Sequence, residues 1–143
     1  MLTFFSKDDE ARIVQAIQDA EHNTSGEIRV HLEKKLEEDV LVEAQRVFTK
    51  LGMHQTAERN GVLIFIAPQH RKFAIIGDEG INQLVGEDFW AAERDIIQQH
   101  FRQGAYAEGI CKAIEQVGEK LKAHFPYQTD DTNELSDEIS YSD

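Results

Sequence analysis

Side chains of the kind that bind metal ions stand at the ends of three apolar segments of this sequence. Glu27 opens an alternating segment, Asn60 precedes a wholly apolar one, and Asp78 and Glu79 follow a third. Carboxylate and amide oxygens are the ligands that Ca²⁺ and Mg²⁺ take, whereas zinc sites use clustered cysteine or histidine. The chain has one cysteine, Cys111, and six histidines without metal-ligand spacing. If the fold joins these segment ends, the sequence predicts a divalent-cation site.

The directions of the predicted strands decide whether these ends meet. Strict alternation over residues 27–33 predicts a half-buried strand, and the apolar run over 62–67 predicts a central strand covered on both faces. Helical spacing over 40–51 makes their connection a crossover, so the two strands should be parallel. The strand over 72–77 follows a short turn and should return antiparallel. The starts of the first two strands and the end of the third should therefore share one edge of the sheet.

Helical patterns before and after these strands complete the expected architecture. Ser6 is a candidate N-cap for the first helix, and Pro126 ends the last one. The order α-β-α-β-β-α-α predicts an α/β fold, a three-layer α/β/α sandwich around a small mixed sheet of about four strands. Residues 2–5 are a weak candidate for the fourth strand. We expect a single domain over residues 1–126 and an acidic, disordered C-terminal tail over 127–143.

The predicted edge gathers oxygen ligands from several loops, and a short link after the third strand keeps Asp88 within reach. Each acid also has a purely structural explanation, since Asp78 and Glu79 stand in a turn sequence and Asp88 can cap the following helix. Arg59 can pair with a carboxylate or hold an anionic substrate such as phosphate. The metal-ligand candidates are Glu27, Asn60, Asp78, Glu79 and Asp88, and the phosphate-binding candidate is Arg59.

The charge of the chain limits its partners. Lys and Arg number 15 against 27 Asp and Glu, which gives a net charge of −12 over 143 residues. The sequence has no basic stripe that could neutralise phosphates, so nucleic-acid binding is not expected. The longest apolar run, residues 62–68, is far shorter than the roughly 20 residues of a membrane helix. The N-terminus lacks a basic region ahead of an apolar one, so we expect a cytoplasmic protein without membrane partners.

Five segments, taken in their order and spacing, resemble a known family. They are residues 24–30, 59–67, 73–78, 86–90 and 101–106. The sequence is similar through them to the TPM domain family, named for a thylakoid lumen protein, a photosystem II repair protein and a receptor-modulating membrane protein. The resemblance covers about residues 4–126. Many members carry a signal peptide and a C-terminal membrane helix, and this sequence resembles a stand-alone, bacterial-type member.

The resemblance implies an α/β/α sandwich of about four strands, with divalent-cation sites beneath the loops at one end of the sheet. Its acidic positions in the matching loops are Asp78 and Asp88, with Glu27 and Asn60 beside them. Many members have a Gly-x-Gly-Leu-Glu-like segment after the third strand, whereas residues 77–81 here are Gly-Asp-Glu-Gly-Ile. Some members have an acid-phosphatase-like activity, and others act in assembly, repair or modulation.

Three hypotheses follow from the sequence. The first is a metal-responsive regulatory or interaction module that binds Ca²⁺ or Mg²⁺ and an unidentified protein partner. The second is a metal-dependent, acid-phosphatase-like hydrolase of phosphomonoesters, in which Arg59 steadies the phosphate and the metal activates water. The third is an acidic α/β domain without a dedicated site. We rank them in this order because the sequence has no recognisable nucleophile–base pair.

Overall fold

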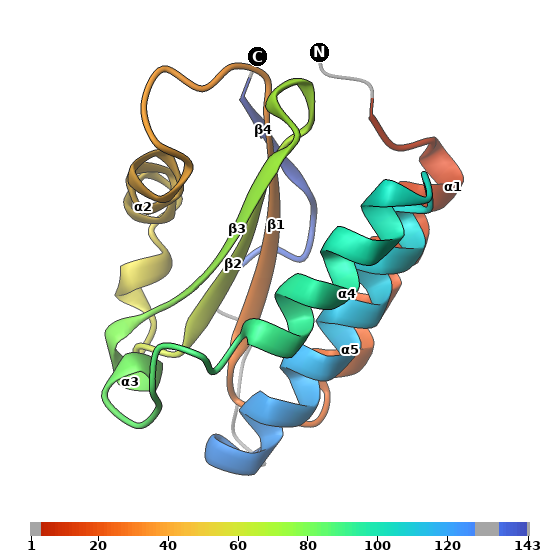
Figure 1. The fold of residues 1–143 in the computed structure, drawn as a ribbon. Helices are drawn as coiled ribbons and strands as arrows, with labels where there is room; N and C mark the ends of the chain where they lie inside the picture. The colour runs from red at the N-terminus through yellow and green to blue at the C-terminus, as the bar shows by residue number, and fades with distance from the viewer. Residues whose placement is uncertain (1–3, 128–134, 143) are drawn as a thin grey trace.

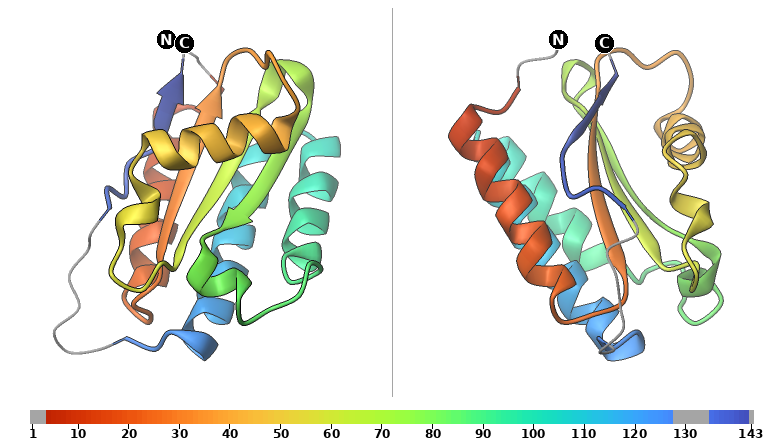
Figure 2. Two further views of the ribbon diagram at one scale, coloured as in Figure 1. Left: turned by 90° about the vertical axis from the view of Figure 1, so that its left-hand side faces the viewer. Right: turned by 180° about the vertical axis from the view of Figure 1, so that it is seen from behind.

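A four-stranded mixed sheet forms the middle layer of the computed structural model, which describes residues 4–127 and 135–142 (Figure 1). Of the four α-helices longer than one turn, three lie on one face of the sheet and one lies on the other, so the chain forms the predicted three-layer α/β/α sandwich (Figure 2). The elements are α1 (Lys7–Glu21), β1 (Glu27–Glu33), α2 (Val40–Lys50), η1 (Met53–Gln55), β2 (Gly61–Ala67), η2 (Pro68–His70), β3 (Lys72–Gly77), α3 (Glu79–Asn82), α4 (Ala91–Arg102), α5 (Tyr106–His124) and β4 (Ser140–Ser142).

The strands lie in the order β3-β2-β1-β4 and have the predicted directions. Strands β1 and β2 are parallel, and Glu27 lies opposite Gly61. Strands β2 and β3 are antiparallel, and Val62 lies opposite Gly77. The starts of β1 and β2 and the end of β3 therefore meet at one edge of the sheet, as the sequence predicted.

Side chains of the two central strands supply both hydrophobic cores. The even-numbered residues of β1, such as Ile28 and Val30, face the layer of α1, α4 and α5, where each fully buried branched side chain contributes about 1.5–3 kcal/mol. Leu63 and Phe65 of β2 face α2 and pack in a smaller core with Phe48. All seven residues of β2 are buried, because helices cover both of its faces.

The fourth strand comes from the C-terminal segment. Ser140–Ser142 form β4, which runs parallel to β1 with Ser140 opposite His31. The prediction of a strand over residues 2–5 is wrong at Phe4 and Phe5, which lie outside any strand, and residues 2 and 3 lie outside the described residues.

The expectation of a disordered tail over 127–143 does not hold for residues 135–142. Ile139 is 9% exposed and joins the larger core, and Leu135 packs against the smaller one. Tyr141 donates its hydroxyl hydrogen bond to the Glu10 carboxylate of α1. Two apolar side chains among acids are enough to anchor this segment, although they make no strand or helix pattern. Residues 128–134 and 143 lie outside the described part of the chain.

Caps and turns set the ends of the helices. The Ser6 hydroxyl accepts the Asp9 amide hydrogen bond at 3.1 Å, so Ser6 is the N-cap of α1, as predicted. Asp39 caps α2 in the same manner through the Leu41 amide. Gly52 follows α2 with φ of 72°, a conformation that glycine adopts without steric cost. Among residues 4–127 and 135–142, no helix combines the length and apolar character needed to cross a bilayer.

Candidate functional site

An ion pair between a partly exposed arginine and a buried aspartate stands at the sheet edge where the candidate residues were predicted to meet. Arg59 binds Asp78 through two hydrogen bonds, from Nε to Oδ2 at 2.8 Å and from Nη2 to Oδ1 at 2.9 Å. The Asp78 side chain is 5% exposed, and its Oδ1 also accepts the Glu79 amide hydrogen bond at 2.7 Å. The Glu79 carboxylate lies 3.4 Å from Arg59 Nη2 and is largely exposed. Hydrogen bonding to Asp78 raises the pKa of Arg59, so Arg59 stays charged and neutralises this carboxylate.

Backbone contacts hold the pair in register with the sheet. The Asp78 amide donates to the Gly61 carbonyl at 2.9 Å, and the Gly80 amide donates to the Arg59 carbonyl at 2.8 Å. A Cβ atom on Gly80 would lie 2.3 Å from the carbonyl oxygen of Glu58 and 2.5 Å from that of Arg59. Only glycine allows this approach, so Gly80 closes the loop of Asp78 onto the loop of Arg59.

Asn60 and its neighbours form the inner part of the edge. Asn60 is 1% exposed, and its side-chain amide donates to Ser25 Oγ at 3.3 Å. Ser25 in turn donates to the Glu58 carboxylate at 2.6 Å. The Asn60 carbonyl accepts the Glu27 amide hydrogen bond at 3.4 Å, and Thr56 Oγ1 accepts the Asn60 amide at 3.3 Å. The structure therefore brings Glu27, Asn60, Asp78 and Glu79 to one sheet edge, together with Ser25, Glu58 and Arg59.

Asp88 occupies a different position. It is exposed in the link between α3 and α4, and its backbone carbonyl accepts the Ala91 amide hydrogen bond at 3.0 Å. Asp88 is not the N-cap of α4, because Trp90 holds that position. Within residues 4–127 and 135–142, no three Asp, Glu, His or Cys side chains are arranged so that they could hold a metal ion together. Glu27, Asn60, Asp78 and Glu79 thus share an edge without forming a preassembled cage, and the expectation that Asp88 joins them does not hold.

Contacts between acids of this edge and the C-terminal segment were not predicted from the sequence. Glu27 is buried, and its Oε1 accepts the Leu135 amide hydrogen bond at 2.7 Å. Glu21, at the end of α1, accepts the Ile28 amide at 2.9 Å and shares a side-chain hydrogen bond with Asp137. Burial, that hydrogen bond and the charges of Asp137 and Glu27 raise the pKa of Glu21 to about 9. Glu21 therefore keeps its proton at neutral pH and can donate it to the Asp137 carboxylate.

The substitution Glu21→Gln should stabilise the domain by about 1–2 kcal/mol at pH 8 and much less at pH 5. The unfolded chain releases this proton near pH 4.5, whereas the folded chain retains it to about pH 9, so wild-type stability falls as pH rises between these values. The glutamine oxygen can still accept the hydrogen bond of the Ile28 amide, and the glutamine NH₂ group can donate to Asp137. The side chain then needs no bound proton to make this contact. Urea unfolding at the two pH values measures the difference, with the exposed Glu119→Gln as control. An equal gain at pH 5 and pH 8 would contradict the assignment.

His31, in the half of β1 that lies away from this edge, contacts two residues of β4. His31 is buried, with Nδ1 2.7 Å from Ser140 Oγ and Nε2 3.2 Å from a Glu33 carboxylate oxygen and 3.1 Å from Ser142 Oγ. Burial lowers the pKa of His31 to about 4, so the imidazole is neutral at physiological pH. A neutral ring can donate to the Glu33 carboxylate and accept from Ser140 at once, so both ring nitrogens have partners without a charge on the imidazole.

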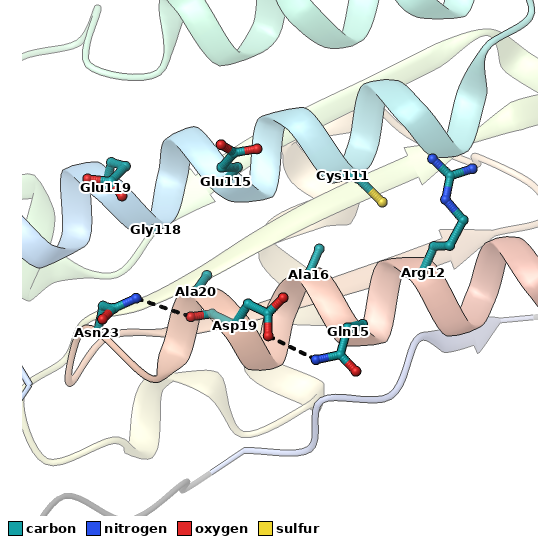
Figure 3. Close-up of a pocket in the computed structure, with 10 residues that line it drawn as sticks. All are labelled: Arg12, Gln15, Ala16, Asp19, Ala20, Asn23, Cys111, Glu115, Gly118 and Glu119. Carbon is teal, nitrogen blue, oxygen red and sulfur yellow. Dashed lines mark hydrogen bonds between the residues drawn. The ribbon is translucent and has the colours of Figure 1, made fainter.

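An open hollow of about 490 Å³ lies along the packed helices α1 and α5 and is lined by side chains of both (Figure 3). Asp19, Glu115 and Glu119 line it against a single cation, Arg12. Cys111 also lines it, and burial raises the pKa of this thiol. A protonated, half-buried thiol is a poor nucleophile, so the hollow has no catalytic group of that kind among its described residues.

Fold and edge together define an α/β/α domain in which loops at one end of a mixed sheet carry acidic and amide side chains. The TPM domain profile matches residues 2–120, and the chain therefore belongs to the TPM domain family. This confirms the resemblance found in the sequence. No curated protein matches the chain.

Solved structures share this architecture. The chain is similar to the BA42 protein of the psychrophilic bacterium Bizionia argentinensis, with 46% identity and a TM-score of 0.93 over 99% of this chain and 98% of that one. The N-terminal domain of a P. gingivalis protein matches with 19% identity and a TM-score of 0.68, over 85% and 78% of the two chains. The N-terminal domain of cg2496 from Corynebacterium glutamicum matches with 18% identity and a TM-score of 0.65, over 94% and 79%. The last two matches show the fold alone.

Proposed function

We propose that this TPM domain binds a divalent cation, Ca²⁺ or Mg²⁺, at the sheet edge of Glu27, Asn60, Asp78 and Glu79, and that cation binding prepares the edge for a protein partner. The observation that supports the proposal most is the gathering of carboxylate, amide and hydroxyl oxygens from three loops at this edge. Hard cations take such oxygens. A cation that joins the loops would also stabilise the fold, because it binds only the folded chain.

Arg59 has a defined part in this proposal. It occupies both oxygens of Asp78, so a cation that uses Asp78 has to displace the guanidinium or share the carboxylate with it. The positive charge of Arg59 also opposes the approach of another cation. Arg59 is therefore an internal counter-ion of the edge and should weaken cation binding.

The contact between Arg59 and Asp78 is also the reason why we place the phosphatase hypothesis second. Its phosphate-binding candidate, Arg59, already holds Asp78 in a two-point pair, which leaves less of the guanidinium for a phosphate. The binding module needs no nucleophile and agrees better with the geometry. A cation-dependent hydrolysis of an aryl phosphate that is lost in Asp78→Asn would reverse this order.

Titration of the metal-free protein with Ca²⁺, followed by backbone amide NMR shifts, tests the proposal. We expect saturable shifts within residues 24–28, 58–61 and 77–81. Asp78→Asn should weaken binding about tenfold, because one anionic ligand is lost. Arg59→Gln should strengthen it about three- to tenfold, because the competing charge is gone. General attraction to an acidic protein would give the same two signs, because one variant removes a negative charge and the other a positive one. A variant with the same change in net charge elsewhere on the surface is therefore needed to assign the effect to this edge.

Lys112→Gln is the matched control for Arg59→Gln. It makes the same change in net charge on the exposed surface of α5, where Lys112 forms an exposed ion pair with Glu108. If Lys112→Gln and Arg59→Gln change the Ca²⁺ affinity equally, the cation does not bind beside Arg59. Shifts that fail to saturate would also contradict the proposal, and the same titration with Mg²⁺ gives the preference between the ions.

A further inference from the structure

A second hollow lies where β2 ends and β3 begins. This end of the two strands is far from the sheet edge described above (Figure 1). The hollow has a volume of about 560 Å³ and lies between η2, the end of α4 and the start of α5. Binding sites for small molecules are usually concave, with volumes of roughly 300–1,000 Å³. This hollow has the size of such a site and lies away from the edge of Arg59 and Asp78.

The charge of its lining is the reverse of the charge of the protein. Arg71, Lys72 and Arg102 line the hollow, and no Asp or Glu is among its described lining residues. The chain as a whole carries a net charge of −12. Three cations without an acid therefore create a local positive potential on an acidic surface.

These cations also have no anionic partner within residues 4–127 and 135–142. Arg12, Arg46 and Arg59 each pair with a carboxylate, whereas no ion pair or side-chain hydrogen bond of Arg71, Lys72 or Arg102 occurs in that part of the chain. Their charged groups are thus available to an anion.

The first of the three cations, Arg71, lies in a turn with an unusual backbone conformation. Its φ is 53°, in the left-handed region, and its amide donates to the Pro68 carbonyl at 3.1 Å. A residue without a Cβ would adopt this conformation at less cost. The turn nevertheless carries an arginine there, directly before Lys72.

Aromatic rings form the apolar part of the lining of the hollow. Phe4 and Tyr106 have ring centroids 4.7 Å apart, and Phe101 lies 5.2 Å from Tyr106 and 5.9 Å from Phe73. Rings in mutual contact make a rigid wall that needs little ordering when a ligand binds.

We propose that this hollow binds a small organic anion, in which a carboxylate or similar acidic group is joined to an aromatic or short aliphatic body. The acidic group would bind among Arg71, Lys72 and Arg102, since guanidinium groups form charge-assisted hydrogen bonds with planar anions. The body would lie against the rings of Phe4, Phe101 and Tyr106. Both features are required together: the cations without the wall suit any anion, and the wall without the cations suits any apolar molecule.

Titration with 3-phenylpropionate, followed by amide NMR shifts of the whole chain, tests this proposal. We expect saturable shifts within residues 66–73 and 98–106. The alcohol 3-phenylpropanol has the same body without the charge, and acetate has the charge without the body. Each should bind at least about tenfold more weakly than 3-phenylpropionate.

Arg102→Gln should reduce the affinity for 3-phenylpropionate about three- to tenfold, because one charge-assisted contact is lost. Arg102 is exposed at the end of α4, so this variant should fold normally, and its amide spectrum checks that it does. Lys112→Gln makes the same change in net charge away from the hollow and should leave the affinity unchanged. The proposal is overturned if the acid and the alcohol bind equally well, if Arg102→Gln binds like the wild type, or if no shift saturates.

Discussion

Replacement of Lys120 by methionine should destabilise the domain by about 3–5 kcal/mol, measured by urea unfolding at pH 7. Lys120 Nζ lies 2.8 Å from an oxygen of Glu93, which is 0% exposed where α4 packs on α5. Nζ also donates to the Phe89 carbonyl and lies over the rings of Phe89 and Trp90, 4.7 and 5.6 Å from their centroids. Methionine fills the space of the lysine stem but leaves the Glu93 carboxylate buried without its cation.

A second variant separates lost charge pairing from lost packing. The pair Glu93→Leu with Lys120→Met removes both charges and should recover most of the stability that Lys120→Met loses, since a buried ion pair adds little over well-packed apolar residues. Lys112→Met, on the exposed side of α5, should cost less than about 0.5 kcal/mol. The interpretation fails if Lys120→Met costs no more than Lys112→Met, or if the double variant is no more stable than Lys120→Met alone.

The substitution Gly80→Ala should cost about 3 kcal/mol or more, because the new methyl group would overlap two backbone carbonyl oxygens. Those carbonyls belong to Glu58 and Arg59 and cannot move aside as a flexible side chain would. The loop of Asp78 therefore has to separate from the loop of Arg59. Thermal and urea unfolding give the loss of stability, and the Arg59 Nε–H resonance reports whether the bond to Asp78 survives.

Gly86→Ala is the matched control for Gly80→Ala. A Cβ atom on Gly86 would meet no atom within 4 Å, and Gly86 does not have a positive φ, so its stability should change by no more than about 0.5 kcal/mol. Equal effects of the two substitutions would show that Gly80 is not needed for close approach.

The sequence predicted the sheet edge well because its evidence was local. Alternation over β1, a wholly apolar β2 and a short turn before β3 fixed the strand directions, and these directions brought Glu27, Asn60 and Asp78 to one edge. Strand β4 escaped prediction because its three residues pair with β1 through tertiary contacts and carry no periodic pattern of their own. Its anchors, Leu135 and Ile139, are separated by polar residues.

The details of the candidate site depended on contacts between distant residues. The sequence left two roles open for Arg59, and the structure pairs it with Asp78. In the sequence, Glu21 has no feature that distinguishes it from an exposed acid at the end of a helix. In the structure it is half-buried and contacts Asp137, far along the chain. No signal in the sequence pointed to this contact. The roles of the edge residues as metal ligands remain predictions.

The unequal covering of the two faces of the sheet has a consequence for hydrogen exchange. Three helices pack on the larger core, whereas α2, with Met53 of η1 and Leu135, closes the smaller one (Figure 2). Fewer apolar contacts have to break for α2 to lift away than for the whole domain to unfold, so its amides should exchange through a sub-global opening. The chain runs from α2 through Gly52 and η1 to Arg59, so the same fluctuation reaches the loop that holds Asp78. A ligand that orders this loop would therefore slow the exchange of α2 amides that it does not touch.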